Sequence, residues 1–129
     1  MNDAYKQHGA FSWSELLVSD IDSALDFYRK VIGWEVEQMD MPNGFYYVLK
    51  AGGEPVGGMM KKPDEISHKP DFWGTYITVD QVDETLAAAK AAGGKEVYPP
   101  MDVPGVGRMC AFTDPGGAMI SVINYEDKE

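Results

Sequence analysis

Three kinds of residue are scarce in this chain, and each scarcity excludes or disfavours a class of structure or function before any motif is considered. The 129 residues contain a single cysteine, Cys110, which excludes an intrachain disulfide. They contain only two histidines, His8 and His68, too few for a histidine-rich metal site. Basic residues are also scarce, because 11 Lys and Arg stand against 21 Asp and Glu, for a formal net charge of −10. This balance argues against nucleic acid or an anionic membrane as a partner.

The sequence also lacks long apolar runs. No stretch approaches the roughly 20 apolar residues that cross a bilayer, and residues 1–8 lack the apolar centre of a signal peptide. We therefore expect a cytoplasmic protein, which suits the free thiol. The length predicts one domain over residues 1–129, with loosely attached ends at 1–9 and 125–129.

What the sequence does contain is the same order of elements twice. Alternating and helical hydrophobic patterns predict two strand–helix–strand–strand–strand series. In the first series they fall at 11–18, 21–32, 34–40, 45–49 and 56–60. In the second they fall at 73–79, 81–92, 95–98, 108–112 and 118–124. Turns are expected at 42–44 and 114–117, a charged linker at 61–70 and an irregular loop at 99–107.

The two series align at a fixed offset of 61 residues. Val18 matches Val79 (79 − 18 = 61), and Asp22 matches Asp83 at the same offset. Any two amphipathic units share apolar positions by chance, but matched Asp and Gly residues favour a duplication. We assign one module to residues 10–61 and another to 70–125. One such module would leave its sheet half covered, so the two are expected to pair.

Specific motifs within this repeat resemble a known family. The segment 18–28, Val-Ser-Asp-Ile-Asp-Ser-Ala-Leu-Asp-Phe-Tyr, is followed by Gly33-Trp34, and Asp-Pro-Gly-Gly precedes the last strand at 114–117. Together they resemble the vicinal oxygen chelate superfamily, which includes glyoxalase I, extradiol dioxygenases and bleomycin-resistance proteins. The resemblance implies an α+β fold of two tandem βαβββ modules whose curved sheets surround a cavity. It also implies a homodimer.

The resemblance further implies where a metal would bind. Metal-dependent members carry His, Gln or Glu ligands on the first and last strand of each module. The corresponding positions here are Trp13, Met60, Gly74 and Ser121. None has an imidazole, carboxylate or carboxamide, the groups that such metals require. We therefore expect neither a metal nor another cofactor.

Strand alternation then selects the side chains expected to face the cavity. The candidate ligand-binding residues are Trp13, Glu15, Met60, Tyr76, Met119 and Ser121. Glu15 is the candidate catalytic group, as an acid or base, although a structural partner such as Arg108 or a lysine would equally explain an inward carboxylate. The apolar segment 99–107 is either a lid or a static connector. Cys110 is expected to be a buried, inert thiol.

The function that these observations favour is binding of a small apolar or aromatic molecule without metal, by a protein similar to glyoxalases and bleomycin-resistance proteins. Two alternatives stay open at this point. One is an enzyme, a metal-dependent lyase or a dioxygenase of the same superfamily. The other is a non-catalytic interaction subunit whose cavity is vestigial.

Overall fold

The computed structural model of the protein describes residues 3–41 and 44–126 and divides the chain into two compact units. The α1 unit consists of residues 13–74. The α2 unit combines the residues up to Ser12 with those from Thr75 onward. The turn predicted at 42–44 falls largely on residues 42–43, outside the described residues.

The described elements repeat the predicted order. The first series is β1 (Phe11–Val18), α1 (Ile21–Val31), β2 (Glu35–Met41), β3 (Gly44–Ala51) and β4 (Glu54–Lys61). The second is β5 (Phe72–Thr78), α2 (Val82–Ala91), β6 (Lys95–Val103), β7 (Gly107–Thr113) and β8 (Met119–Tyr125). Short 3-10 helices η1 (Asp3–Lys6) and η2 (Asp64–Ile66) complete the set. The predicted α+β class and the βαβββ order are confirmed.

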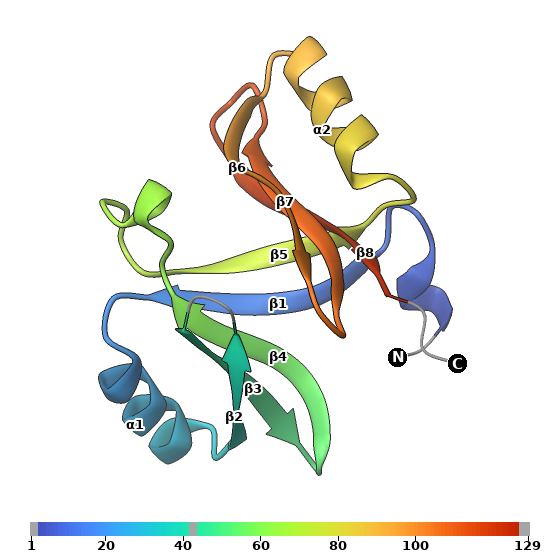
Figure 1. The fold of residues 1–129 in the computed structure, drawn as a ribbon. Coiled ribbons are helices and arrows are strands. Elements are labelled where there is room, and N and C mark those ends of the chain that lie inside the picture. The colour runs from blue at the N-terminus through green and yellow to red at the C-terminus, as the bar shows by residue number, and fades with distance from the viewer. Residues whose placement is uncertain (1–2, 42–43, 127–129) are drawn as a thin grey trace. The chain divides into compact units, whose positions relative to one another are not determined.

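In the α1 unit the strands follow the order β2-β3-β4-β1, and α1 covers one face of them (Figure 1). Strands β1 and β4 are parallel, whereas β2, β3 and β4 form antiparallel pairs. The apolar face of α1 packs on alternate strand residues, and its Leu25 joins a core with Leu16, Val18, Leu49 and Met59. Alternation therefore leaves the intervening side chains on the opposite face, which we call the helix-free face of the α1 unit.

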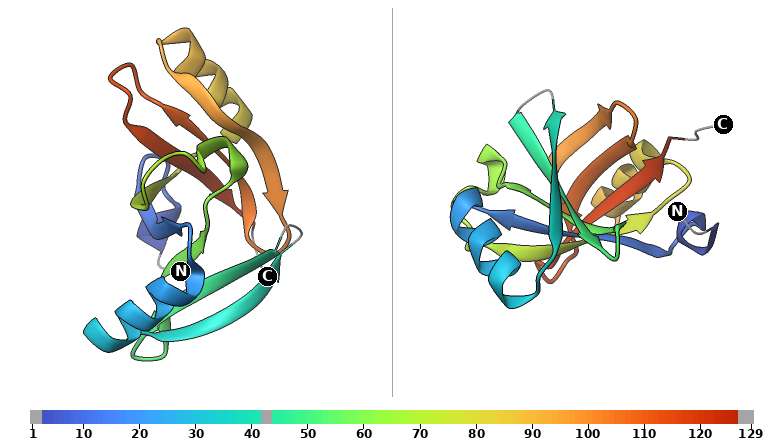
Figure 2. Two further views of the ribbon diagram at one scale, coloured as in Figure 1. Left: turned by 90° about the vertical axis from the view of Figure 1, so that its left-hand side faces the viewer. Right: turned by 90° about the horizontal axis from the view of Figure 1, so that it is seen from below.

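The α2 unit repeats this plan with the strand order β5-β8-β7-β6 (Figures 1 and 2). Strands β5 and β8 are parallel, and α2 packs on the face whose core contains Val79, Val82, Leu86, Cys110 and Val122. The other side is the helix-free face of the α2 unit. The predicted burial of Cys110 is confirmed, since its exposed fraction is 0%.

The prediction of an irregular loop at 99–107 is wrong for most of that segment. Strand β6 continues to Val103, and Met101 pairs with Met109 across the β6–β7 hairpin. Pro99 and Pro100 suggested a break, but the ladder passes them through an irregularity between Tyr98 and Met101. Because only residues 104–106 form the turn, the structure shows a β-hairpin in place of the predicted irregular loop.

Two further segments are more closely attached than the sequence suggested. In the predicted linker, Ile66 is buried and the Lys62 ammonium group lies beside Asp71. At the other end, the backbone N–H of Gly9 donates to the carbonyl of Thr78 at 2.7 Å, and His8 accepts from the N–H of Asp80 at 2.9 Å. Neither segment is a free tail. Among the described helices, none combines the length and apolar character needed to cross a membrane.

Candidate functional site

Two aromatic side chains meet on the helix-free face of the α1 unit. The indole N–H of Trp13 on β1 donates to the hydroxyl oxygen of Tyr46 on β3 at 2.7 Å. Between those strands, Gly58 of β4 provides the space, since a Cβ atom there would lie 1.7 Å from the Tyr46 hydroxyl oxygen. The bond therefore spans β4 and sets the orientation of both rings. Tyr46 was not predicted as a site residue. Its position in the strand could have indicated it, because alternation places Tyr46 on the face opposite to the core residue Leu49.

Glu15 is a buried acidic residue of the same face. It lies opposite Gly58 in the parallel β1–β4 ladder and is only 3% exposed. A carboxyl group this far from water must be protonated, hydrogen-bonded or paired with a cation, because an isolated buried charge is very costly. Arg108, considered as its partner, instead holds Asp83 and Asp102 within the α2 unit, at 2.8 and 3.1 Å.

The helix-free face of the α2 unit carries hydroxyl and thioether groups. Tyr76 and Ser121 lie opposite each other in the parallel β5–β8 ladder, and both are buried. The Tyr76 hydroxyl donates to the sulfur of Met109 at 3.7 Å, and the hydroxyls of Tyr98 and Ser121 are 3.5 Å apart. Tyr98 and Met109 were not predicted as site residues, although both fell within the predicted strands at 95–98 and 108–112.

Strand pairing corrects the repeat offset in the last strand of each series. Glu15 lies opposite Gly58, and Tyr76 lies opposite Ser121. The first strands therefore correspond at 76 − 15 = 61, but the last strands correspond at 121 − 58 = 63. Gly58, not Met60, is the counterpart of Ser121. The extra two residues lie between α2 and β8, where the β6–β7 ladder contains two irregularities.

The corrected positions still do not fit a divalent metal. Trp13 offers an indole N–H, which is a donor only, and Gly58 and Gly74 offer no side chain. Ser121 alone carries an oxygen, and its hydroxyl lies next to that of Tyr98. Within the described residues, no three His, Cys, Asp or Glu side chains gather as a metal-ligand set. The donor chemistry at these positions is thus unlike that of the metal-dependent family members.

The six predicted ligand-binding residues divide between the two units. Trp13, Glu15 and Met60 lie in the α1 unit, and Tyr76, Met119 and Ser121 lie in the α2 unit. By strand alternation each belongs to the helix-free face of its own unit. A single cavity shared by all six stays a prediction.

Comparisons with known proteins agree with this architecture. The chain is 43% identical over 116 residues to "Putative glyoxylase CFP32" of Mycobacterium bovis, a match that covers 89% of this chain and 44% of that protein. It is 31% identical over 127 residues to "Anthracycline biosynthesis protein DnrV" of Streptomyces peucetius, covering 88% of this chain and 46% of that protein. The chain thus spans less than half the length of these curated relatives.

Solved structures show the same fold. A hypothetical protein from Bacillus halodurans C-125 superposes with a TM-score of 0.68 at 13% identity, covering 95% of this chain and 99% of that one. At this identity the likeness concerns the fold alone. The profile of the Glyoxalase/Bleomycin resistance protein/Dioxygenase superfamily matches residues 10–122. The chain belongs to this superfamily.

Proposed function

We propose that the protein binds a small apolar or aromatic molecule on its helix-free faces, without a divalent metal. The observation that carries the proposal is the Trp13–Tyr46 hydrogen bond over Gly58. It places a pair of aromatic rings at a position where metal-dependent relatives need a ligand. Aromatic and thioether side chains with a few hydroxyl groups are typical of small-molecule pockets.

The polar groups on these faces would orient the molecule. Glu15 and Ser121 are both buried, on β1 and β8 respectively. Buried polar groups with fixed partners discriminate strongly between ligands that match them and ligands that do not. We assign them the role of polar anchors, and we assign Trp13, Met60, Tyr76 and Met119 the role of apolar contacts.

A fluorescence titration tests the proposal with 1-anilinonaphthalene-8-sulfonate, an aromatic probe. We expect saturable binding that Trp13→Ala and Tyr76→Ala each weaken by about two- to tenfold, the range of a lost aromatic contact. Phe45→Ala is the matched control. It removes a half-exposed ring from β3, and strand alternation places Phe45 on the face opposite to Tyr46.

The outcomes separate the alternatives. Binding that Phe45→Ala weakens as much as Trp13→Ala would contradict the assignment to the helix-free face. No saturable binding at all would favour the interaction-subunit alternative. Unchanged affinity in Glu15→Gln would remove Glu15 from the polar anchors while leaving the apolar contacts in place.

We further propose that two copies of the chain form a homodimer in the cytoplasm. The relatives named above are each more than twice as long as the segment that this chain matches, so they have room for a second segment of this size. Two copies would reproduce that length. Light scattering after gel filtration should give twice 14.2 kDa; a mass of 14.2 kDa at all concentrations would contradict the dimer.

A further inference from the structure

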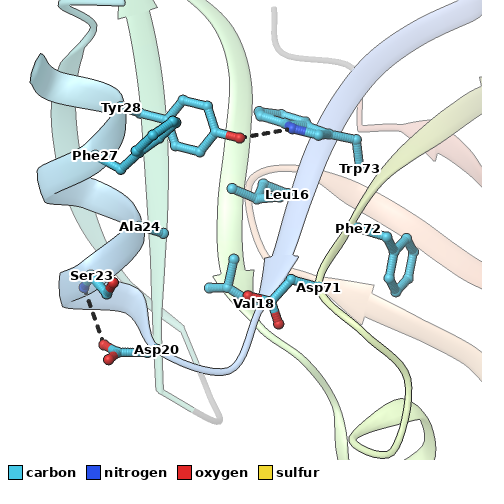
Figure 3. A pocket seen from close by; sticks show the side chains of 10 residues that line it. All are labelled: Leu16, Val18, Asp20, Ser23, Ala24, Phe27, Tyr28, Asp71, Phe72 and Trp73. Atoms are coloured by element: carbon cyan, nitrogen blue, oxygen red, sulfur yellow. Dashed lines mark hydrogen bonds between the residues drawn. The ribbon is translucent and has the colours of Figure 1, made fainter. Parts of the chain in front are cut away.

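A cleft of about 370 Å³ opens on the helix side of the α1 unit, between α1 and residues 71–73 (Figure 3). Leu16, Val18 and Ala24 form its apolar floor. These β1 side chains belong to the helix-packed face, so the cleft lies on the opposite side of the strands from Trp13 and Glu15. Its volume is at the lower end of the range for small-molecule sites.

One end of the cleft is aromatic. Phe27 and Tyr28 of α1 and Trp73 of β5 line it, and Figure 3 shows Tyr28 and Trp73 facing each other. The Trp73 indole N–H donates to the Tyr28 hydroxyl at 3.2 Å, while Trp34 stacks on Tyr28 with the ring centroids 5.5 Å apart. These contacts hold the rings in place before any ligand arrives. Phe27 is nevertheless 54% exposed and Trp73 43% exposed.

The other end is acidic. Asp20 and Asp71 line it, and both carboxylates lie below the aromatic end in Figure 3. Asp20 accepts from the backbone N–H of Ser23 at 3.1 Å, which compensates the positive end of α1. Asp71 accepts from the N–H of Ser19 at 3.1 Å, and its Oδ1 atom lies 3.1 Å from the Lys62 ammonium.

This arrangement leaves a net negative charge at the acidic end. The ammonium of Lys62 is almost fully buried behind Asp71 and also donates to the carbonyl of Lys69. The hydrogen bond from Lys62 lowers the pKa of Asp71 below its usual value, and a carboxyl group with such a pKa is ionised at neutral pH. The acidic end therefore contains two carboxylates, those of Asp20 and Asp71, and one ammonium group, that of Lys62. The formal net charge of the whole chain is −10.

We propose that this cleft binds a small organic ammonium ion with an aromatic or aliphatic body. The ammonium group would lie between Asp20 and Asp71, and the body would lie along the apolar floor toward the rings of Phe27, Tyr28 and Trp73. Tyr28 follows Asp20 by eight positions, a rise of about 12 Å along α1, so the ligand is elongated. The rings at the far end offer apolar contact area to the body of such a molecule.

The test uses three probes that share one body: 3-phenylpropylammonium, the neutral 3-phenylpropan-1-ol and the anionic 4-phenylbutanoate. Each is titrated into the ¹⁵N-labelled full chain, and the indole N–H signals of Trp13, Trp34 and Trp73 are assigned with Trp73→Phe and Trp13→Phe. We expect 3-phenylpropylammonium to shift the Trp73 signal saturably, with weaker binding of the alcohol and weaker still of the carboxylate. The Trp13 signal, from the other face, should move little.

Charge variants locate the ammonium group. Asp20→Asn should weaken binding of 3-phenylpropylammonium by about two- to fivefold, the range of an exposed ion pair, while Asn still caps α1. Asp26→Asn is the matched control, because Asp26 is an exposed acid of α1 that does not line the cleft. Equal weakening by both substitutions would reduce the effect to general charge attraction and overturn the proposal.

Two other results would also overturn it. If the alcohol binds as tightly as the ammonium ion, the acidic end plays no part. If the Trp73 signal shifts on dilution of the protein alone, a second copy of the chain covers the cleft. Because these probes and signals differ from those used for the helix-free faces, failure here leaves the proposed function intact.

Discussion

The hydroxyl group of Tyr46 lies so close above Gly58 that a Cβ atom at this glycine would come within 1.7 Å of it. Trp13 donates a hydrogen bond to the same hydroxyl at 2.7 Å. Three neighbouring strands thus contribute to one fixed arrangement of rings. The absence of a side chain at Gly58 is a condition for this arrangement.

Replacing Gly58 by alanine should therefore displace Tyr46 and lower the free energy of unfolding by about 1–3 kcal/mol, as overpacking does. Urea denaturation measures the loss. The control is the same substitution in a Tyr46→Ala background, where the obstacle is gone and the cost should fall to a few tenths. Equal costs in the two backgrounds would contradict the close contact.

The two helices offer a matched pair of N-caps. Asp20 caps α1 by accepting from the Ser23 N–H, whereas Gln81 at the start of α2 makes no such side-chain bond. Asp20→Ala should thus cost about 1 kcal/mol in thermal or urea unfolding, and Gln81→Ala should cost little. Gln81→Asp should stabilise the protein, because it creates the missing cap. A loss of stability in Gln81→Asp would show that α2 begins differently.

The ion pair of Asp83 predicts a specific acid sensitivity. Arg108 donates from Nε and Nη2 to the two carboxylate oxygens of Asp83 at 2.8 and 3.0 Å, which lowers the pKa of Asp83. A carboxyl whose pKa is lower in the folded state stabilises above its unfolded pKa, near 3.8, and this stability is lost as pH falls through the folded pKa.

In Asp83→Asn, the free energy of unfolding should therefore fall less steeply below about pH 4 than in the parent protein. Urea midpoints measured at successive pH values report this decline. Asp22→Asn is the control, since Asp22 is the repeat equivalent of Asp83 and forms no ion pair within residues 3–41 and 44–126. If both variants keep the parental pH profile, Arg108 contributes nothing through Asp83.

Cys110 should be unreactive in the folded protein. Burial raises the pKa of its thiol to about 11, and its exposed fraction is 0%. Since the thiolate is the reactive form, 5,5′-dithiobis(2-nitrobenzoate) at pH 8 should react only after unfolding in urea. Stoichiometric reaction with the native protein within minutes would contradict the burial.

The predictable part of this fold depended on residues with strong local patterns. The alternation around Leu16 and Val18, the helical spacing after Asp20 and the left-handed Gly33 (φ 85°) were readable because each follows from local geometry. These signals were sufficient for the α+β class and for the order of the elements.

The missed features depend on contacts between distant residues. Pro99 and Pro100 suggested a loop, but pairing of Met101 with Met109 extends the strand past them. Tyr46 can lie beside Trp13 only because Gly58, twelve residues later in the chain, has no side chain and leaves space for the Tyr46 ring. The offset of 61 failed in the last strand because the β6–β7 ladder is irregular. Such tertiary contacts are not encoded in any single window of sequence.

Metal independence is the central claim, and thermal unfolding with Mn²⁺, Ni²⁺, Zn²⁺ or Fe²⁺ tests it most directly. A ligand at 100 times its Kd stabilises the folded state by about 2.7 kcal/mol, which is several degrees in Tm for a chain of this size. We predict that the Tm is the same with each metal as with chelator. A rise of several degrees with one metal, reversed by EDTA, would contradict the account.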